Sequence, residues 1–264
     1  MQTSLAPLFV RGFLLLLLGA CSKDVVPEYL QVETNLSSGA ELLAINQPIK
    51  VAFNSKLQRP VRSSAVSIID DAGRPVSGYE LFVVGNTIEI VGALPAAGDL
   101  SDGTFKPSQS YTVLLKGLPA VSALRSEQNN YLHHDVMLRV AFLSLDHQNV
   151  LTRFDANVKP IRVTNQVSNQ AIDVSKIKSL RLNCDGPIDP RSLESGQLIL
   201  ANNSQQNIAC RLRLLSNNHS SSVLEVELPK FSGTAYLVLP ETLEGIGQRD
   251  FSASTRQFRL VSAL

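Results

Sequence analysis

The chain has 264 residues, of which 44% are hydrophobic, and its 24 Lys and Arg against 23 Asp and Glu give a formal net charge of +1. This hydrophobic content is sufficient for packed cores, so long disordered regions are not expected. Nucleic-acid-binding proteins normally carry a basic excess. The balanced charge therefore predicts that nucleic acid is not a partner.

The first segment with a clear pattern is the N-terminus, which has the layout of a secretory signal peptide. A basic residue, Arg11, precedes an apolar run over residues 13–18, and small residues then lead to Cys21. This run is shorter than the roughly 20 apolar residues that a membrane-spanning helix needs. The motif Leu18-Gly19-Ala20-Cys21 resembles the lipobox of bacterial lipoproteins. An ordinary cleaved signal peptide and a retained anchor are the alternatives.

The lipobox resemblance implies that residues 1–20 are removed and that Cys21 is acylated, with residues 21–28 as a tether. The lipid would hold the protein on a membrane, because two or more acyl chains bind a bilayer stably. The residue after the cysteine is Ser22 rather than Asp. By resemblance to the sorting rule of bacteria with two membranes, this favours the outer membrane. We therefore expect a lipid-anchored protein of the cell envelope, on its periplasmic or surface face.

Residues 29–145 contain short runs of alternating apolar and polar residues, separated by turn residues such as those at 71–75 and 85–86. Successive side chains of a strand point to opposite faces, so this pattern predicts an all-β module. The expected strands are residues 30–34, 48–53, 65–70, 79–84, 87–91, 110–116 and 136–144.

Residues 146–156 are the expected linker, although Val150 and Leu151 could pack against either neighbouring module. Residues 157–264 form a second module with the same kind of pattern. Its expected strands are residues 161–165, 179–184, 197–201, 208–215, 223–228, 234–239 and 251–261. One helical turn is predicted at residues 189–193, where Asp189 can cap the turn and Pro190 takes the first position.

The two modules are related by an offset of 131 residues. Leu30 falls on Ile161 and Val51 on Leu182, and the apolar parity agrees without a gap from about residue 30 to residue 84. A period this long indicates tandem domains rather than a solenoid.

Several motifs resemble the bacterial Ig-like domain of surface-layer proteins, the SbsA type. In the first module they are Val51-Ala52-Phe53, Leu57, Asp71-Ala72-Gly73-Arg74-Pro75-Val76 and the late strand at 110–118 with its Gly117-Leu118 ending. In the second module residues 187–193 resemble the family's turn after its first long strand, while Cys184 replaces the Phe. The resemblance implies two tandem Ig-like β-sandwiches that serve as spacers, adhesive units or accessory domains. The antibody subtype packs a Trp against its disulfide, and this chain has no Trp.

Two cysteines remain in the mature chain, Cys184 and Cys210, and both lie at the inward parity of their expected strands. In an oxidising compartment such a pair can form a disulfide. Two buried thiols that behave as small apolar side chains are the alternative.

The sequence predicts no catalytic residue, metal or cofactor. His133 and His134 are adjacent, but a zinc site needs three or four ligands and no other His lies nearby in the sequence. The acidic turn at 99–103 lacks the alternating ligands of a calcium loop. No Ser stands in a Gly-x-Ser-x-Gly motif. His147 lies in the expected linker, and His219 lies in a polar hairpin loop.

We therefore expect a non-enzymatic structural or protein-interaction module, whose bare edge strands could accept a strand from an envelope protein. The alternative is a surface glycan-binding lipoprotein that uses exposed aromatic residues. Tyr29, Tyr131 and Phe231 are the candidates for such a surface in a chain with 5 Tyr and no Trp. An envelope hydrolase is the third hypothesis.

Overall fold

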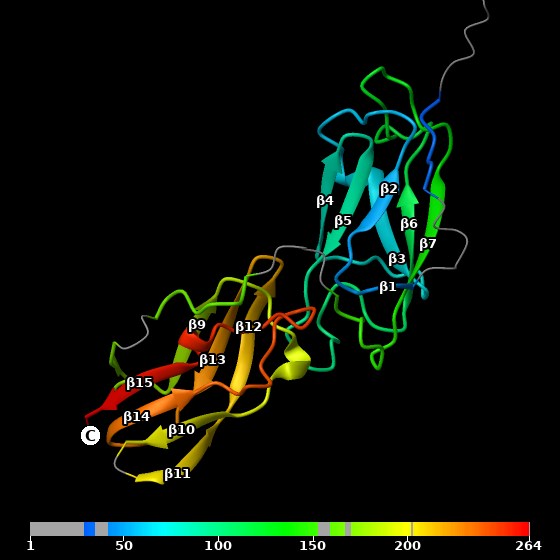
Figure 1. The fold of residues 1–264 in the computed structure, drawn as a ribbon. Coiled ribbons are helices and arrows are strands. Elements are labelled where there is room, and N and C mark those ends of the chain that lie inside the picture. Colours follow the sequence, from blue (N-terminus) through cyan, green and yellow to red (C-terminus); the bar gives the residue numbers. More distant parts are fainter. Residues whose placement is uncertain (1–28, 35–41, 153–158, 167–169, 202, 264) are drawn as a thin grey trace, which may run out of the picture.

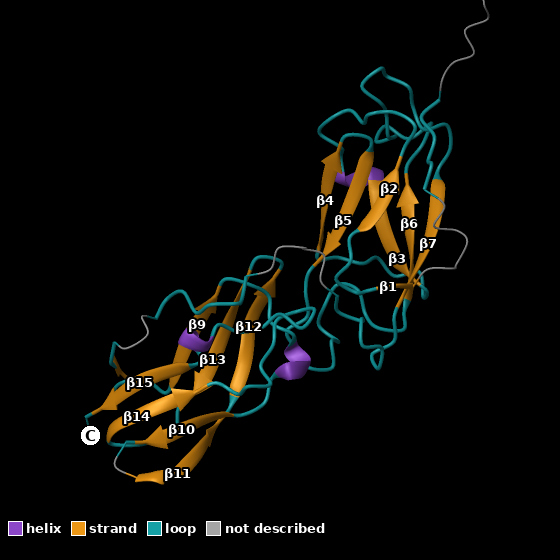
Figure 2. Cartoon of the chain, in the orientation of Figure 1, coloured by secondary structure: helices purple, strands orange, loops and turns teal. Residues whose placement is uncertain are grey.

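The structure, a computed structural model, describes residues 29–34, 42–152, 159–166, 170–201 and 203–263. In these ranges the regular elements are β-strands and three short 3-10 turns, η2 (Ser63–Ala65), η3 (Pro190–Ser192) and η4 (Ala253–Thr255) (Figures 1 and 2). The prediction of an all-β chain is confirmed. Within the same ranges, no helix has the length and hydropathy that crossing a membrane requires.

The first β-sandwich pairs a four-stranded sheet of order β1-β7-β6-β3 with a three-stranded sheet of order β2-β5-β4. Neighbouring strands are antiparallel except β1 and β7, which are parallel. The strands are β1 (Leu42–Leu43), β2 (Ile49–Ala52), β3 (Val66–Asp70), β4 (Tyr79–Val84), β5 (Thr87–Gly92), β6 (Ser110–Leu115) and β7 (Val136–Phe142).

The second β-sandwich pairs a five-stranded sheet of order β11-β10-β14-β15-β8 with a three-stranded sheet of order β12-β13-β9. Here β8 and β15 are the parallel pair. The strands are β8 (Ile172–Asp173), β9 (Ser179–Cys184), β10 (Gly196–Leu200), β11 (Asn203–Cys210), β12 (Leu212–Asn218), β13 (Ser221–Glu227), β14 (Gly233–Val238) and β15 (Gln257–Ser262).

Both sandwiches have the strand order of the immunoglobulin fold. When strands B to G follow one another along the chain, that fold forms a B-E-D sheet and a C-F-G sheet. Strands β2 to β7 follow this order, and so do β9, β10 and β12 to β15. The second sandwich adds β11 beside β10, in the place of the additional strand of variable-type domains. The Ig-like sandwich prediction is therefore confirmed by the chain's own topology.

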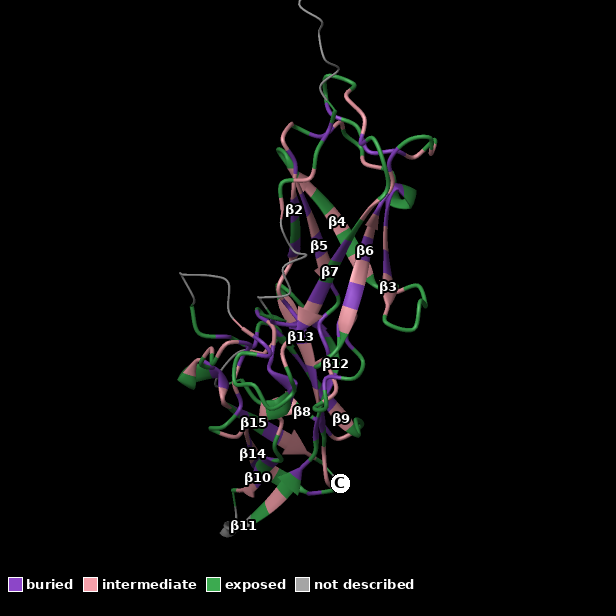
Figure 3. Ribbon diagram, turned by 90° about the vertical axis from the view of Figure 1, so that its right-hand side faces the viewer, coloured by how far each residue is buried: buried purple, intermediate pink, exposed green. Residues whose placement is uncertain are grey.

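Each sandwich encloses a core of its own, built from the alternate side chains that its two sheets turn towards each other. Ile88 and Ile90 of β5 and Val113 of β6 are completely buried in the first core. Leu224 of β13 and Leu237 of β14 are completely buried in the second core. Figure 3 shows this alternation of buried and exposed positions along the strands.

Four expected strands differ in the structure. Residues 30–34 and 161–165 contribute only single bridges, among them Val32 with Phe53 and Val163 with Cys184. Residues 208–215 are divided between β11 and β12, which belong to opposite sheets. Cys210 and Leu212 are both buried, so the alternation of inward and outward side chains continues where the chain passes from one sheet to the other. The sequence pattern therefore gives no sign of the division. Residues 251–261 contain a bridge at Phe251 and the turn η4 before β15 begins.

The predicted helical turn at 189–193 is confirmed as η3. Pro190 occupies its first position, and the Asp189 carboxylate accepts the Arg191 N–H at 2.9 Å. Val150 and Leu151, from the expected linker, pack in the core of the first sandwich.

Candidate functional site

A hollow lined by three arginines lies at one end of the first sandwich, and we call it the arginine pocket. It is formed by residues 58–62, which follow β2, and by residues 121–125 and Tyr131, which lie between β6 and β7. Its volume is about 320 Å³, and its lining includes Arg59, Arg62 and Arg125 but no acidic residue. The pocket therefore has the charge of an anion-binding site.

Neutral groups hold two of these arginines. Arg62 Nη1 donates to the carbonyl oxygen of Val121 at 3.3 Å. Arg125 Nη1 donates to Tyr131 Oη at 3.3 Å, and its guanidinium lies 6.0 Å from the centre of that ring. None of the ion pairs among the described residues involves Arg59, Arg62 or Arg125. Their guanidinium groups are therefore available for charge-assisted hydrogen bonds to an oxyanion.

The wall of the arginine pocket also contains a polar atom without a partner. Gln58 Oε1 is buried, and it is the single buried side-chain N or O atom of the described residues that has no hydrogen bond. An unpaired buried polar group costs free energy and calls for an explanation. A side-chain amide can present either its oxygen or its NH₂ group. Rotation of this amide would be needed for Gln58 to hydrogen-bond to a ligand in the pocket.

The arginine pocket adjoins the residues at which the described chain begins. Leu30 N donates to the carbonyl oxygen of Tyr131 at 3.1 Å, and Asn54 Nδ2 donates to that of Tyr29 at 3.1 Å. The loops that form the pocket lie at the end of the first sandwich remote from the second (Figure 1). Apolar side chains stand nearby on these loops, with Val121 91% exposed and Leu118 42% exposed.

The junction between the two sandwiches is the second candidate region. Asn217 of β12 donates from Nδ2 to the carbonyl oxygens of Pro95 and Ile188, both at 2.8 Å, and its Oδ1 accepts from Ile188 N at 3.1 Å. His219 Nε2 lies 2.9 Å from the carbonyl oxygen of Gly92, which requires the ring nitrogen to donate. Two hydrogen bonds thus connect the β12–β13 hairpin to the residues around the end of β5.

Apolar side chains cross the same junction in both directions. Ile246, from the loop before β15, is buried in the core of the first sandwich. Ala96, from the loop after β5, packs against the core of the second sandwich. The junction is therefore part of the packed structure of both sandwiches.

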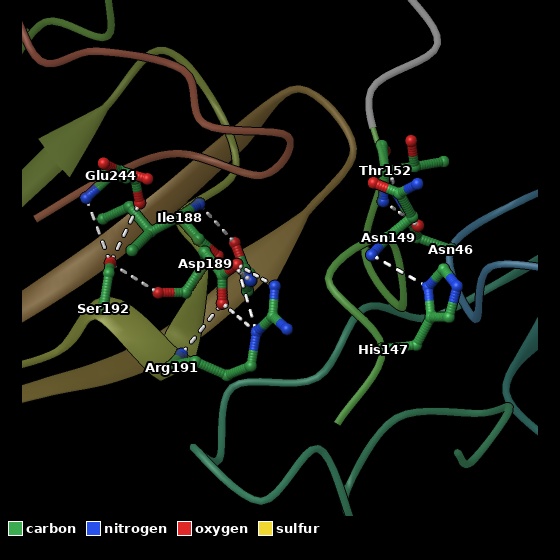
Figure 4. Close-up of polar contacts among 10 residues, drawn as sticks. Asn46, His147, Asn149, Thr152, Ile188, Asp189, Arg191, Ser192 and Glu244 are labelled. Carbon is green, nitrogen blue, oxygen red and sulfur yellow. Dashed lines mark hydrogen bonds and ion pairs between the residues drawn. The ribbon is translucent and has the colours of Figure 1, made fainter. Parts of the chain in front are cut away.

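A polar cleft of about 320 Å³ opens at this junction, between residues 148–152 of the first sandwich and residues that include Asp189, Arg191 and Glu244 of the second. Figure 4 shows that Asp189 and Arg191 bond to each other and that the backbone of Glu244 bonds to Ser192. Arg191 Nη2 lies 2.6 Å from Asp189 Oδ2, and this hydrogen bond raises the pKa of Arg191. Glu244 N donates to Ser192 Oγ at 3.0 Å. These contacts shape the loops, and the Asp189 carboxylate serves to cap η3 rather than to act as a free base.

Cys184 and Cys210 are free thiols in the structure, and both are buried in the second core. Of the two alternatives that the sequence leaves open, the structure contains the buried thiols and not the disulfide. Burial raises the pKa of each thiol to about 11, so both remain protonated and poorly nucleophilic at neutral pH. Cys21 lies outside the described residues.

The polar candidates weighed from the sequence do not converge on one site. His133 Nδ1 and His134 Nε2 contact each other at 2.6 Å. No group of three or more His, Cys, Asp or Glu side chains in the described ranges is placed to hold a metal ion. In the turn at 99–103, Asp99 Oδ1 accepts from Ser101 N at 3.1 Å and Asp102 Oδ1 accepts from Ala96 N at 3.0 Å. These two carboxylates cap backbone groups of their own loop.

The three aromatic candidates are also separate. Tyr29 is 38% exposed, and its ring lies 4.5 Å from that of His133. Tyr131 is half-buried beside Arg125. Phe231 is only 8% exposed because it packs into the second core, so it is not available as a candidate for a glycan-binding surface.

Sequence reasoning missed both the arginine pocket and the junction. The arginines come from two loops that only the folded sandwich brings together. The pair Arg59 and Arg62, three residues apart beside Pro60, is the local signal that could have drawn attention to the first loop. The alternation pattern contains nothing that marks Ile246 as part of the other module's core.

No protein-family model matches the chain, and no curated protein matches it. Among solved structures, the chain is similar to the native conformation of E. coli alpha-2-macroglobulin, with 10% identity, a TM-score of 0.41, and coverage of 89% of this chain and 14% of that chain. It is also similar to a structure of titin, with 9% identity, a TM-score of 0.28, and coverage of 83% of this chain and 92% of that chain. The fold assignment rests on the strand order of the chain itself.

Proposed function

We propose that this chain is a lipid-anchored protein of the cell envelope whose two Ig-type sandwiches act as a non-enzymatic structural or protein-interaction module. The observation that carries the module role is the junction. Hydrogen bonds from Asn217 and His219 and the apolar contacts of Ala96 and Ile246 join the two sandwiches into one unit. Such a unit holds its outer end at a defined distance from its base.

The lipobox supports the anchor and gives the unit an orientation. The tether of residues 22–28 spans at most about 25 Å when fully extended. The first sandwich then lies near the membrane, and the second sandwich lies further out. Ser22, after the acylated cysteine, favours the outer membrane.

Intact mass spectrometry of the protein purified from membranes tests the anchor. The expected result is a chain that begins at Cys21 and carries acyl groups, and Cys21→Ser should abolish both the processing and the membrane association. An unmodified N-terminus, or unchanged membrane association of Cys21→Ser, would contradict the lipoprotein proposal. Ser22→Asp, which keeps Cys21, serves as the control for sorting between the two membranes.

Site-specific photo-cross-linking in intact cells tests the interaction role. Strand β4 is an edge strand of its sheet, and its Phe82 and Val84 are 46% and 60% exposed. Edge strands can accept a partner strand. A cross-linker at Val84 should capture one envelope protein, whereas a cross-linker at Thr112, which is half-buried on central strand β6 and paired with strands on both sides, should not. Equal capture from both positions, or none from Val84, would count against strand addition at β4.

A further inference from the structure

We infer that the arginine pocket binds the phosphate of anionic phospholipid headgroups, so that the base of the first sandwich docks on the bilayer. This inference deepens the proposed function, because it uses the orientation that the lipid anchor provides. Its physical basis is the pocket itself, which the described residues form whether or not Cys21 is acylated.

The charge of the pocket favours an anionic ligand. Arg59, Arg62 and Arg125 converge on one hollow whose lining contains no acid, and none of the three has an ion-pair partner among the described residues. Guanidinium groups bind phosphate with paired N–H donors in a geometry that lysine cannot match. A pocket of about 320 Å³ is large enough for a headgroup.

The wall of the pocket is also partly polar. Gln58 lines it, and rotation of its side-chain amide would let this residue hydrogen-bond to a headgroup. A glycerol phosphate headgroup offers both a phosphate for the arginines and hydroxyls for such an amide.

The position of the pocket also favours a membrane surface. The wall residue Tyr131 is hydrogen-bonded through its backbone to Leu30, so the pocket adjoins the start of the described chain, from which the tether leads to Cys21. Val121, 91% exposed beside the pocket, and Leu118, 42% exposed, are apolar side chains suited to the headgroup boundary of a bilayer. Arginines beside exposed apolar side chains, close to the anchor, match a membrane surface better than they match a dissolved ligand.

The experiment uses the mature chain without its lipid, residues 21–264 with Cys21→Ser, which retains every described residue. Co-sedimentation is measured with vesicles of phosphatidylcholine alone and with vesicles that also contain phosphatidylglycerol. Binding is expected only to the anionic vesicles, and it should weaken as salt is raised. Equal binding to both kinds of vesicle, or binding to neither, would overturn the inference.

Substitutions assign the binding to the pocket. Arg59→Ala with Arg125→Ala should weaken binding to the anionic vesicles about 30-fold, as expected for the loss of two basic side chains at such a surface. Arg211→Ala with Arg259→Ala is the matched control, since these arginines are exposed on the second sandwich and the change in net charge is the same. The control pair should bind as the parent does, and a comparable loss in the control would refute the assignment. If the alanine pair fails to fold, Arg59→Lys with Arg125→Lys is tested in its place. Binding to the anionic vesicles should again weaken, because the charge is kept but the paired N–H donors are lost.

Two further measurements distinguish a lipid phosphate from a dissolved one, and the docking inference from the anchor proposal. If sn-glycerol 3-phosphate protects Arg59 and Arg125 from chemical modification while anionic vesicles do not, the ligand is a dissolved phosphate ester and the docking inference fails. Acylation of Cys21 is read separately from the N-terminal mass. If the protein is acylated but its lipid-free form does not bind anionic vesicles, only the docking inference is refuted. If the protein is not acylated but binds these vesicles, only the anchor proposal is refuted.

Discussion

Asn217→Ala is expected to destabilise the second sandwich more than any surface substitution of similar size. The side chain of Asn217 is only 9% exposed and makes three hydrogen bonds, two to Ile188 and one to Pro95 across the junction. Each such bond contributes about 1 kcal/mol net, and the buried Ile188 N–H would be left without a partner. The expected loss is about 3 kcal/mol in the free energy of unfolding.

Urea unfolding, followed by circular dichroism, measures this loss. If the two sandwiches unfold in separate steps, the transition of the second sandwich should move, because Ile188 belongs to it. Asn207→Ala is the matched control, since Asn207 is exposed on β11 and makes no side-chain hydrogen bond with a described residue. The control should stay within about 0.5 kcal/mol of the parent. A loss below about 1 kcal/mol for Asn217→Ala would refute the assignment of these three bonds as structural.

Four other substitutions or treatments have defined outcomes. Gly117→Ala should lower the free energy of unfolding by about 1–3 kcal/mol, because a Cβ there would overlap the backbone of His134. Gly98→Ala is the control, since its Cβ would make only an ordinary contact at 3.5 Å. Thermal melts should show a lower midpoint for Gly117→Ala than for Gly98→Ala. Ile246→Ala should cost about 2–5 kcal/mol and should destabilise the first sandwich, whose core it completes, so an effect confined to the second sandwich in urea unfolding would contradict that packing. Cys184 and Cys210 should resist iodoacetamide in the native protein at pH 9 and react in urea; rapid native labelling, or a mass two hydrogens lower, would show that the buried thiol state is not the one in solution. Because burial raises both thiol pKa values from 9.0 to about 11, the native state holds these protons more tightly than the unfolded state, and stability should fall as the pH rises from about 9 to about 11.

Side-chain alternation was sufficient to predict most of the strands. The expected bounds of β4 and β9 agree with the structure to the residue, because in both strands alternate side chains enter a core. The cap of η3 was also predictable, since Asp189 and Pro190 act within one turn of the chain. The division between β11 and β12 was not, because parity records which side faces inward but not which sheet the strand joins.

The candidate site depended on tertiary structure that no local pattern records. Arg59 and Arg125 are brought together only because their loops leave the same end of the sandwich. The sequence left the disulfide and the buried thiols of Cys184 and Cys210 as alternatives for a related reason. Both side chains point into one core, as predicted, but shared burial alone does not fix the Cα and Cβ separations that a disulfide needs.

The position of Ile246 in the first core has a consequence for the order in which the protein matures. A chain is synthesised from its N-terminus, and early domains usually fold before later ones appear. Here the first sandwich lacks one of its interior side chains until nearly the whole polypeptide has been made. The first sandwich is therefore completed only after β14 has been made, and termination before Ile246 would leave both sandwiches incomplete.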